Sequence, residues 1–317
     1  MMKNKFICAV SALCVAAVCL TGCDKIMLVP GQSSGSISDP QSSAESKSEI
    51  SEYPVILNDT EITASPQTVI SLTPAYTEIL FEMGYGDRLI AVSDYCDYPA
   101  ETEGLPTVSG STSPDIAQIS RLKPELLITA TPMVTKDKAA LEALGIKVLT
   151  IPAPVTLEQF ESIYKLFGLA FEGLFTGEEK GEHAFDVIKK SADKAEKGEK
   201  VKFAYITAAL SPAGGNTFES AVLSLFGENV AEKGSAYDFP AADLAKNQPD
   251  VIFLNDEYTL KDLQDNKTYA SLDAVKNGKV IVISNKYFER PSARITELVD
   301  DITAQLGGEN TLTEQAE

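Results

Sequence analysis

Beyond Pro66 the chain alternates between short apolar runs and segments in which apolar residues recur with helical spacing. The runs are rich in β-branched residues, which favours buried strands over helices. The predicted strands of this first block are residues 68–71, 89–92, 126–129 and 148–151. The predicted helices between them are residues 77–83, 116–122 and 138–144. This alternation is typical of a parallel sheet with crossover helices.

The pattern changes after residue 155. Thr156 with Gln159, and Thr176 with Glu179, have the spacing of a capping box, so each pair predicts the start of a helix. The second helix extends to about residue 197, and about twenty residues at a rise of about 1.5 Å make a rod of roughly 30 Å. A second alternating block follows, with predicted strands at residues 202–206, 251–254 and 280–283. The sequence therefore predicts an α/β protein with two parallel-sheet lobes joined by one long rigid helix.

Two segments of the chain share one design. Residues 113–128 and residues 239–253 each contain a proline, a short helical pattern and a second proline just before a buried strand. Proline suits the first turn of a helix and disfavours helix in the residue before it, so both segments predict a helix that ends shortly before its strand. We therefore expect the two lobes to be pseudo-equivalent.

Composition excludes several classes of function. The net charge of −19 argues against sequence-independent binding to a nucleic-acid backbone, which needs clustered Lys and Arg. His183 is the only histidine of the chain, whereas most zinc, copper and non-haem iron sites need several imidazoles or thiolates. A hydrolase-like G-x-S-x-G pattern at residues 31–35 lies in a Ser-rich stretch without a predicted strand or helix. We expect no metal site, no resident cofactor and no catalytic residue.

The first residues predict export and anchoring. Lys3 and Lys5 precede an uncharged apolar run over residues 6–20, which is the layout of a secretory signal and is short for a membrane span. The run ends in Leu20-Thr21-Gly22-Cys23, which resembles the lipobox of bacterial lipoproteins and implies a lipidated Cys23. The alternative is an ordinary signal in which Cys23 is incidental. Residues 31–52 contain nine Ser and few apolar residues, so we expect a flexible tether.

Several stretches of the body, taken in order, are similar to one known family. The chain resembles the substrate-binding proteins of ABC importers for cobalamin, iron siderophores and haem, which have the class III periplasmic-binding-protein fold. The stretches that carry the resemblance are residues 69–78, 92–99, 113–128, 144–148, 227–229, 239–253 and 288–294. The domains expected on this basis are 1–22 (signal), 23–65 (tether), 66–155 (N-terminal lobe), 156–200 (connecting helices), 201–310 (C-terminal lobe) and 311–317 (tail).

The resemblance implies a ligand between the lobes, contacted by loops at the carboxyl ends of strands. The candidate ligand-binding residues are Pro74, Ala75, Tyr76, Asp94, Tyr95, Phe239, Tyr287, Glu289 and Arg290. Tyr95, Phe239 and Tyr287 offer flat apolar faces to a macrocycle, while Arg290 suits a carboxylate, a phosphate or an amide edge. The alternative is that the aromatic residues are half-buried packing residues and that Arg290 forms an internal ion pair.

The chain also departs from the family's pattern. It has no Trp, although cobalamin-binding members often line the cleft with Trp. The family's docking Glu on each proline-bounded helix, which contacts an Arg of the permease, is replaced by Ala117 and Ala242. Nearby Asp115 and Asp243 are candidate replacements, since a charge on the same helix steers docking. The alternative is that they are N-terminal helix acids favoured by the helix dipole.

These expectations combine into one functional hypothesis. We expect a monomeric, extracytoplasmic receptor, anchored to the cell membrane by Cys23, that captures cobalamin or a related corrinoid. It would deliver this ligand without chemical change to an ABC permease and ATPase complex. A ferric siderophore or haem is the alternative ligand. A tethered sensor that kept the fold and lost transport is the alternative from a different class, and Ala117 and Ala242 motivate it.

Overall fold

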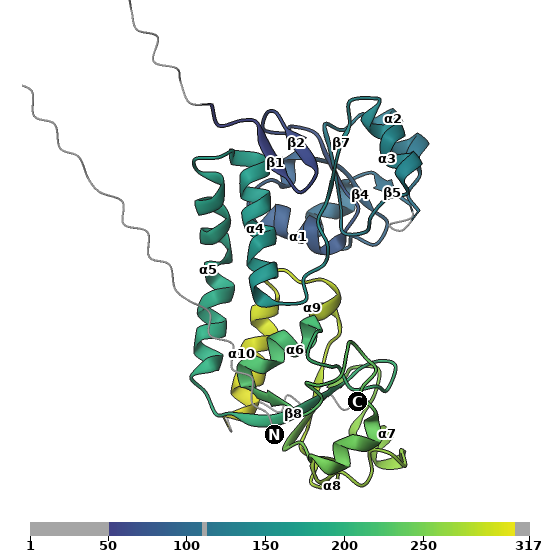
Figure 1. Ribbon diagram of the computed structural model, residues 1–317, viewed down its shortest axis with the longest axis vertical. Coiled ribbons are helices and arrows are strands. Elements are labelled where there is room, and N and C mark those ends of the chain that lie inside the picture. Colours follow the sequence, from purple (N-terminus) through teal and green to yellow (C-terminus); the bar gives the residue numbers. More distant parts are fainter. Residues whose placement is uncertain (1–50, 110–112, 308–317) are drawn as a thin grey trace, which may run out of the picture. The chain divides into compact units, whose positions relative to one another are not determined.

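The computed structural model describes residues 51–109 and 113–307. The N-terminal lobe contains a five-stranded parallel sheet in the order β5-β4-β3-β6-β7 (Figure 1). Its strands are β3 (Val69–Ser71), β4 (Leu89–Ser93), β5 (Thr107–Val108), β6 (Leu126–Thr129) and β7 (Lys147–Thr150). Its helices are α1 (Pro74–Glu82), η1 (Gly86–Arg88), η2 (Ala100–Gly104), α2 (Ile116–Leu122) and α3 (Thr135–Glu142). The predicted parallel sheet with crossover helices is confirmed.

A small antiparallel hairpin precedes this sheet, made of β1 (Val55–Leu57) and β2 (Thr60–Ile62). It lies within residues 23–65, which the sequence assigned to the tether. Alternate side chains of the hairpin are buried, and Thr60 Oγ1 donates to the Val148 carbonyl of β7 at 2.7 Å. The hairpin therefore belongs to the folded body, and three-residue strands are too short to show a periodic signal in the sequence.

The C-terminal lobe contains a four-stranded parallel sheet in the order β9-β8-β10-β11. Its strands are β8 (Val201–Ile206), β9 (Gly227–Asn229), β10 (Val251–Asn255) and β11 (Val280–Ile283). Its helices are α6 (Phe218–Leu223), η3 (Ser224–Phe226), η4 (Ala241–Lys246), α7 (Leu260–Asp265), α8 (Asp273–Lys276) and α9 (Lys286–Glu289). The sheet orders match strand for strand, with β4-β3-β6-β7 corresponding to β9-β8-β10-β11. The topology supports the pseudo-equivalence of the lobes, although the second proline-bounded helix, η4, is 3₁₀ where α2 is α-helical.

The connection between the sheets is a helical hairpin, with α4 (Leu157–Glu172) antiparallel to α5 (Gly177–Glu196) (Figure 1). The 20-residue α5 is the predicted long helix, and α4 is the helix predicted to begin after Thr156, whose hydroxyl accepts from the Gln159 amide. The last helix, α10 (Ile295–Leu306), packs along α5. The rod is thus reinforced by neighbouring helices over part of its length.

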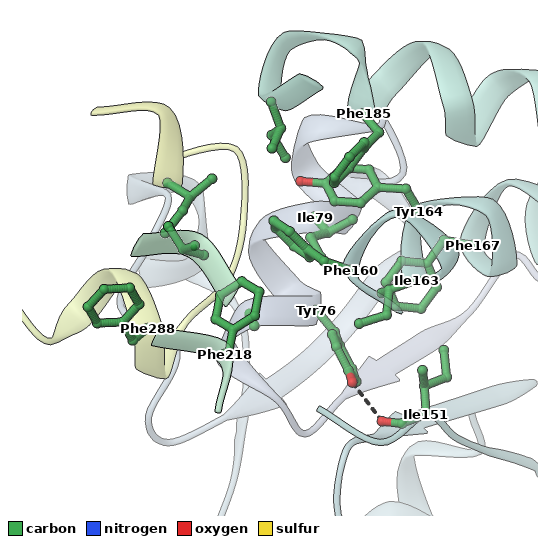
Figure 2. Close-up of a cluster of buried hydrophobic side chains, with 14 of the residues drawn as sticks. Tyr76, Ile79, Ile151, Phe160, Ile163, Tyr164, Phe167, Phe185, Phe218 and Phe288 are labelled. Carbon is green, nitrogen blue, oxygen red and sulfur yellow. Dashed lines mark hydrogen bonds between the residues drawn. The ribbon is translucent and has the colours of Figure 1, made fainter. Parts of the chain in front are cut away.

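One continuous core links the helical hairpin to both sheets. Phe160 of α4 makes edge-to-face contacts with Phe185 of α5 and with Phe218 of α6, which belongs to the C-terminal lobe (Figure 2). From the N-terminal lobe, Tyr76 of α1 makes an edge-to-face contact with Phe167 of α4. Because each lobe shares aromatic packing with the same helix, bending the connection disturbs a close-packed interior.

Candidate functional site

Two adjoining pockets lie beside the loops at the carboxyl ends of the strands. The first, which we call the glutamate pocket, has a volume of about 460 Å³, and its walls include Val155, Asn216, Glu219, Tyr237, Asn285 and Glu289. The second, which we call the arginine pocket, has a volume of about 350 Å³ and is lined by Asp97, Tyr98, Lys286, Glu289, Arg290 and Arg294. Glu289 belongs to both pockets, so together they form one cleft. Open parallel sheets bind ligands at this edge.

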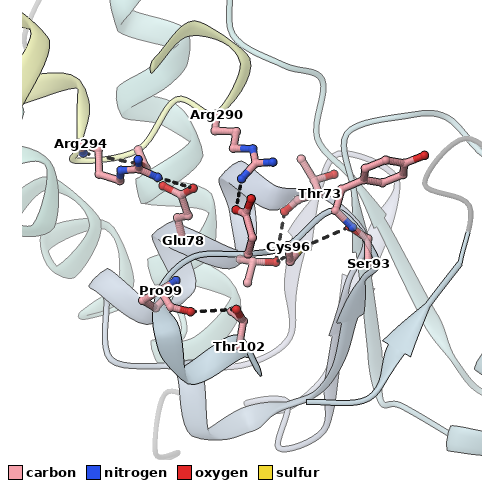
Figure 3. Close-up of polar contacts among 12 residues, drawn as sticks. Thr73, Glu78, Ser93, Cys96, Pro99, Thr102, Arg290 and Arg294 are labelled. Atoms are coloured by element: carbon pink, nitrogen blue, oxygen red, sulfur yellow. Dashed lines mark hydrogen bonds and ion pairs between the residues drawn. The ribbon is translucent and has the colours of Figure 1, made fainter. Parts of the chain in front are cut away.

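The N-terminal wall of the cleft is the loop after β4. Cys96 holds this loop to the sheet: its amide donates to the Ser93 carbonyl, and its sulfur lies 3.2 Å from the hydroxyls of Ser93 and Thr77 (Figure 3). The aromatic side chains beside this anchor stay exposed, Tyr95 by 59% and Tyr98 by 43%. Large exposed aromatic faces next to a pocket are suited to a flat ligand.

The segment after α9 ties the C-terminal lobe to the N-terminal lobe. Arg290 forms an ion pair with the exposed Asp97 (Figure 3). Arg294 lies 3.2 Å from an oxygen of Glu78, which is 1% exposed, and its guanidinium carbon lies 4.2 Å from the centre of the Tyr98 ring. Arg294 therefore positions an aromatic residue of the cleft as well as neutralising a buried acid.

Two glutamates of α1, the buried Glu78 and the exposed Glu82, contact this segment. Ser292 Oγ donates to Glu78 at 2.6 Å. Glu82 accepts from the Ala293 amide at 2.9 Å and from the Tyr164 hydroxyl at 2.7 Å. Burial raises the pKa of Glu78 and of Glu82, and these hydrogen bonds oppose the shift. Both acids are interlobe contacts, and Glu78 is the one that is buried.

The C-terminal wall is built from two loops that pair with each other. The Gly214 amide donates to the Ala236 carbonyl, and the Ala236 amide donates to the side chain of Asn216. A Cβ at Gly214 would collide with the backbone of Gly234, so this close approach requires glycine. The pairing presents Tyr237, whose hydroxyl donates to Glu219 at 2.9 Å. Burial, followed by the charge of Glu219, raises the pKa of Tyr237 above its usual value.

The predicted ligand-binding residues divide into exposed and packed groups. Pro74, Asp94, Tyr95, Glu289 and Arg290 have exposed or half-buried side chains near the cleft loops, and Glu289 and Arg290 line the pockets.

Four other predicted residues are engaged elsewhere in the structure. Ala75 and Tyr76 are buried, and the Tyr76 hydroxyl donates to the Ile151 carbonyl at 2.6 Å (Figure 2). Phe239 packs against the core of the C-terminal lobe. The Tyr287 hydroxyl donates to Glu297 at 2.9 Å, and burial and this bond raise the pKa of Tyr287 to about 12. Neither Tyr95 nor Tyr287 lines either pocket.

Sequence reasoning missed several lining residues. Tyr98 lies three residues after the predicted Tyr95, and Tyr237 lies two residues before the predicted Phe239. Both are aromatic, and each belongs to a loop that also holds a predicted ligand-binding residue. Glu219 and Asn285 carry no signal in the sequence, because only the folded loops bring them together.

The two predicted docking acids already have local partners. Asp115 is the N-cap of α2 and accepts from the Gln118 amide at 2.9 Å. Asp243 forms a 2.7 Å ion pair with Lys246 within η4. Ala117 and Ala242 are exposed on these same short helices.

Cys23, the apolar run at residues 6–20 and the Ser-rich stretch lie outside the described residues. Over residues 51–109 and 113–307, no helix is both long and apolar enough to cross a bilayer. Within the same ranges, no three residues among His, Cys, Asp and Glu are grouped so that they would hold a metal ion.

Two parallel-sheet lobes on a helical connection, with pockets at the carboxyl ends of their strands, define a solute-binding protein of the class III type. The chain belongs to the periplasmic binding protein family, whose model matches residues 69–287. The resemblance found in the sequence is thereby confirmed for the family and the fold.

Known proteins resemble the chain over nearly their whole length. It is 25% identical to YvrC of Bacillus subtilis, an uncharacterized ABC transporter substrate-binding lipoprotein, over 93% of this chain and 95% of that protein. It is 27% identical to the vitamin B12-binding protein of Vibrio campbellii, over 78% of this chain and 93% of that protein. A possible iron-binding periplasmic solute-binding protein from Staphylococcus epidermidis has the same fold, with a TM-score of 0.64, 20% identity and coverage of 75% of this chain and 98% of that one. The chain is therefore an ABC transporter substrate-binding protein.

Proposed function

We propose that this protein is the extracytoplasmic receptor of an ABC importer for cobalamin or a related corrinoid. It captures the corrinoid in the cleft and passes it unchanged to the permease and ATPase. The observation that carries the proposal is the similarity to a vitamin B12-binding protein over 93% of that protein's length and 78% of this chain. The exposed rings of Tyr95, Tyr98 and Tyr237 support it, because aromatic faces suit a large flat macrocycle.

The residues proposed to meet the ligand come from both lobes. Tyr95 and Tyr98 supply apolar faces from the N-terminal lobe, and Tyr237 supplies one from the C-terminal lobe. Arg290 and Glu289 supply the polar contacts between them. Ala75 and Tyr76 are buried, so their role is to hold the loop that starts α1.

Isothermal titration of the protein with cobinamide, cobalamin, haem and ferric siderophores tests the ligand. We expect saturable binding of cobinamide or cobalamin, weakened about tenfold or more by Tyr98→Ala or Tyr237→Ala, as for a central aromatic contact. Phe175→Ala is the matched control, because Phe175 is an aromatic residue 52% exposed in the turn between α4 and α5 and lines neither pocket. If only haem or a ferric siderophore binds, that compound and not a corrinoid is the ligand. If none of these compounds binds, the proposed role in their uptake is excluded.

Anchoring and docking form a second part of the proposal. Lipidated Cys23 holds the monomeric receptor at the membrane, and Asp115 and Asp243 steer it to the permease. Cys23→Ser should move the protein from the membrane fraction to the soluble fraction. Asp115→Asn and Asp243→Asn keep side-chain acceptors while removing charge, so they should lower uptake in vesicles without changing ligand affinity. Unchanged uptake in the double variant would remove these two residues from the docking surface.

A further inference from the structure

The charged side chains that line the glutamate pocket are all negative. Glu219 and Glu289 bring two negative charges to it, and no Lys or Arg is among the described residues that line it. Its apolar surface includes Val155 and the rings of Phe218 and Phe288. Glu219 is half-buried, so its charge is screened less than in open water, whereas Glu289 is exposed. An anionic group entering this pocket would therefore be repelled.

Hydrogen bonds inside the pocket use the hydroxyl donors, whereas the side-chain amides of Asn216 and Asn285 keep N–H donors. The Tyr237 hydroxyl donates to one oxygen of Glu219 at 2.9 Å, and the Asn285 amide nitrogen donates to one oxygen of Glu289 at 2.6 Å. The buried Thr217 hydroxyl donates to the Gly214 carbonyl. Each carboxylate keeps further lone pairs, and so does the Tyr237 oxygen. The walls therefore offer a ligand amide donors as well as acceptors, and among their described residues the only formal charges are negative.

The neighbouring arginine pocket offsets this negative charge only in part. Arg290 is paired with Asp97, and Arg294 is paired with Glu78 and lies over the Tyr98 ring. The Lys286 ammonium lies 4.8 Å from the centre of the Tyr287 ring. Arg290 and Arg294 are thus paired with acids, whereas Lys286 is exposed and keeps its positive charge.

We propose that the glutamate pocket takes an edge of the ligand that carries hydrogen-bond donors or positive charge, such as primary amides or an amine, and excludes carboxylates. This inference rests on the proposed function for the location of the ligand, and it adds the chemical class of the ligand's edge. Primary amides can donate hydrogen bonds to both glutamates without charge repulsion. A carboxylate on the ligand has only acceptors and a negative charge, so the two glutamates would repel it.

Two pairs of probes of opposite charge test the inference on the full chain in detergent solution. The first pair is cobinamide, whose ring carries amides, against cobyrinic acid, the cobalt corrin with carboxylates in their place. The second pair is cationic ferrioxamine B against anionic ferric enterobactin. We expect the amide or cationic member of a pair to bind at least about tenfold more tightly, as for hydrogen bonds to charged groups. We also expect added salt to narrow the difference.

Variants of the two glutamates test whether the preference for amide or cationic probes arises in the glutamate pocket. Glu219→Gln with Glu289→Gln should reduce the ratio of affinities within a pair about tenfold, because the charges are removed and the shapes are kept. Glu196→Gln, an exposed glutamate at the end of α5, is the matched control and should leave the ratio unchanged. Thermal unfolding followed by circular dichroism shows whether the double variant is folded, and the probe series on the unmodified protein does not depend on that variant.

The outcomes separate this inference from the proposed function. Equal or tighter binding of cobyrinic acid, or a ratio unchanged in the double variant, overturns the charge preference while corrinoid binding stands. Failure of both corrins with selective binding of ferrioxamine B overturns the corrinoid proposal and supports the charge preference. Preference for ferric enterobactin, or binding of none of the four probes, overturns the inference.

Discussion

The close approach of α4 and α5 makes Gly181→Ala an informative substitution. Alanine favours the helix, but its side chain would overpack the contact between the two helices. Gly181 of α5 faces the backbone of α4, and a Cβ at this position would lie 2.5 Å from Lys165 Cα and from the Tyr164 carbonyl oxygen. Replacing a helical glycine by alanine stabilises a helix by about 1 kcal/mol when space is free. Here the obstructing atoms are backbone, so the two helices must separate.

Overpacking of an interior costs about 1–3 kcal/mol, and an obstruction by backbone belongs at the upper end of this range. After the gain in helix propensity, Gly181→Ala should lower the free energy of unfolding by about 2 kcal/mol. For a body of this size that lowers the melting temperature by about 4–8 °C. Thermal and urea unfolding followed by circular dichroism at pH 7 measure both quantities.

Gly104→Ala is the matched control, because a Cβ at Gly104 would meet no atom within 4 Å. This variant should be neutral or stabilised by up to about 1 kcal/mol. If Gly181→Ala melts at or above the temperature of the unmodified protein, the helices part without cost and the view of the hairpin as a close-packed rod is refuted.

Two further predictions concern the ion pairs and hydrogen bonds between the lobes. Arg294→Met should cost about 3 kcal/mol at pH 7, because it leaves Glu78 buried without its cation, whereas Asp97→Ala should cost less than about 1 kcal/mol because Asp97 is exposed. Equal losses in urea unfolding would contradict this ranking. Burial raises the pKa of Glu82, so the folded state binds its proton more tightly and stability falls as pH rises from the ordinary glutamate value of 4.5 through the raised pKa. Glu82→Gln should make the decline of the unfolding midpoint between pH 4 and pH 8 shallower, and an unchanged slope would remove Glu82 as its cause.

Local patterns were sufficient to predict much of the fold. The strands β6 and β11 and the helix α2 have the predicted bounds, because β-branched runs and flanking prolines mark their ends. Helix α1 starts three residues earlier than predicted, at Pro74, since proline is well suited to the first turn of a helix. Strands of two or three residues, such as β5 and β9, are set by pairing with longer neighbours and leave no periodic signal.

The site was harder to predict, because contacts between distant parts of the chain decide it. Glu78 and Glu82 have helical spacing and would be expected on an exposed face of α1, yet both are contacted by residues more than two hundred positions later, and Glu78 is buried. Tyr237 reaches the pocket because its loop pairs with the loop around Gly214. Local sequence could identify these loops as candidates, but only the folded pairing decides which aromatic side chain faces the cleft.

The interlobe contacts also bear on how a ligand enters. Separating residues 292–294 from α1 would leave the buried Glu78 carboxylate without Ser292 and Arg294, and breaking a buried ion pair costs about 3 kcal/mol or more. A state opened in that way would hold less than about one per cent of the molecules at equilibrium. The pair of Arg290 with the exposed Asp97 is much weaker, and the Tyr95 side chain is 59% exposed. Entry should therefore depend on side-chain motion at the mouth of the cleft, with the two lobes held in place by α1 and the segment that follows α9.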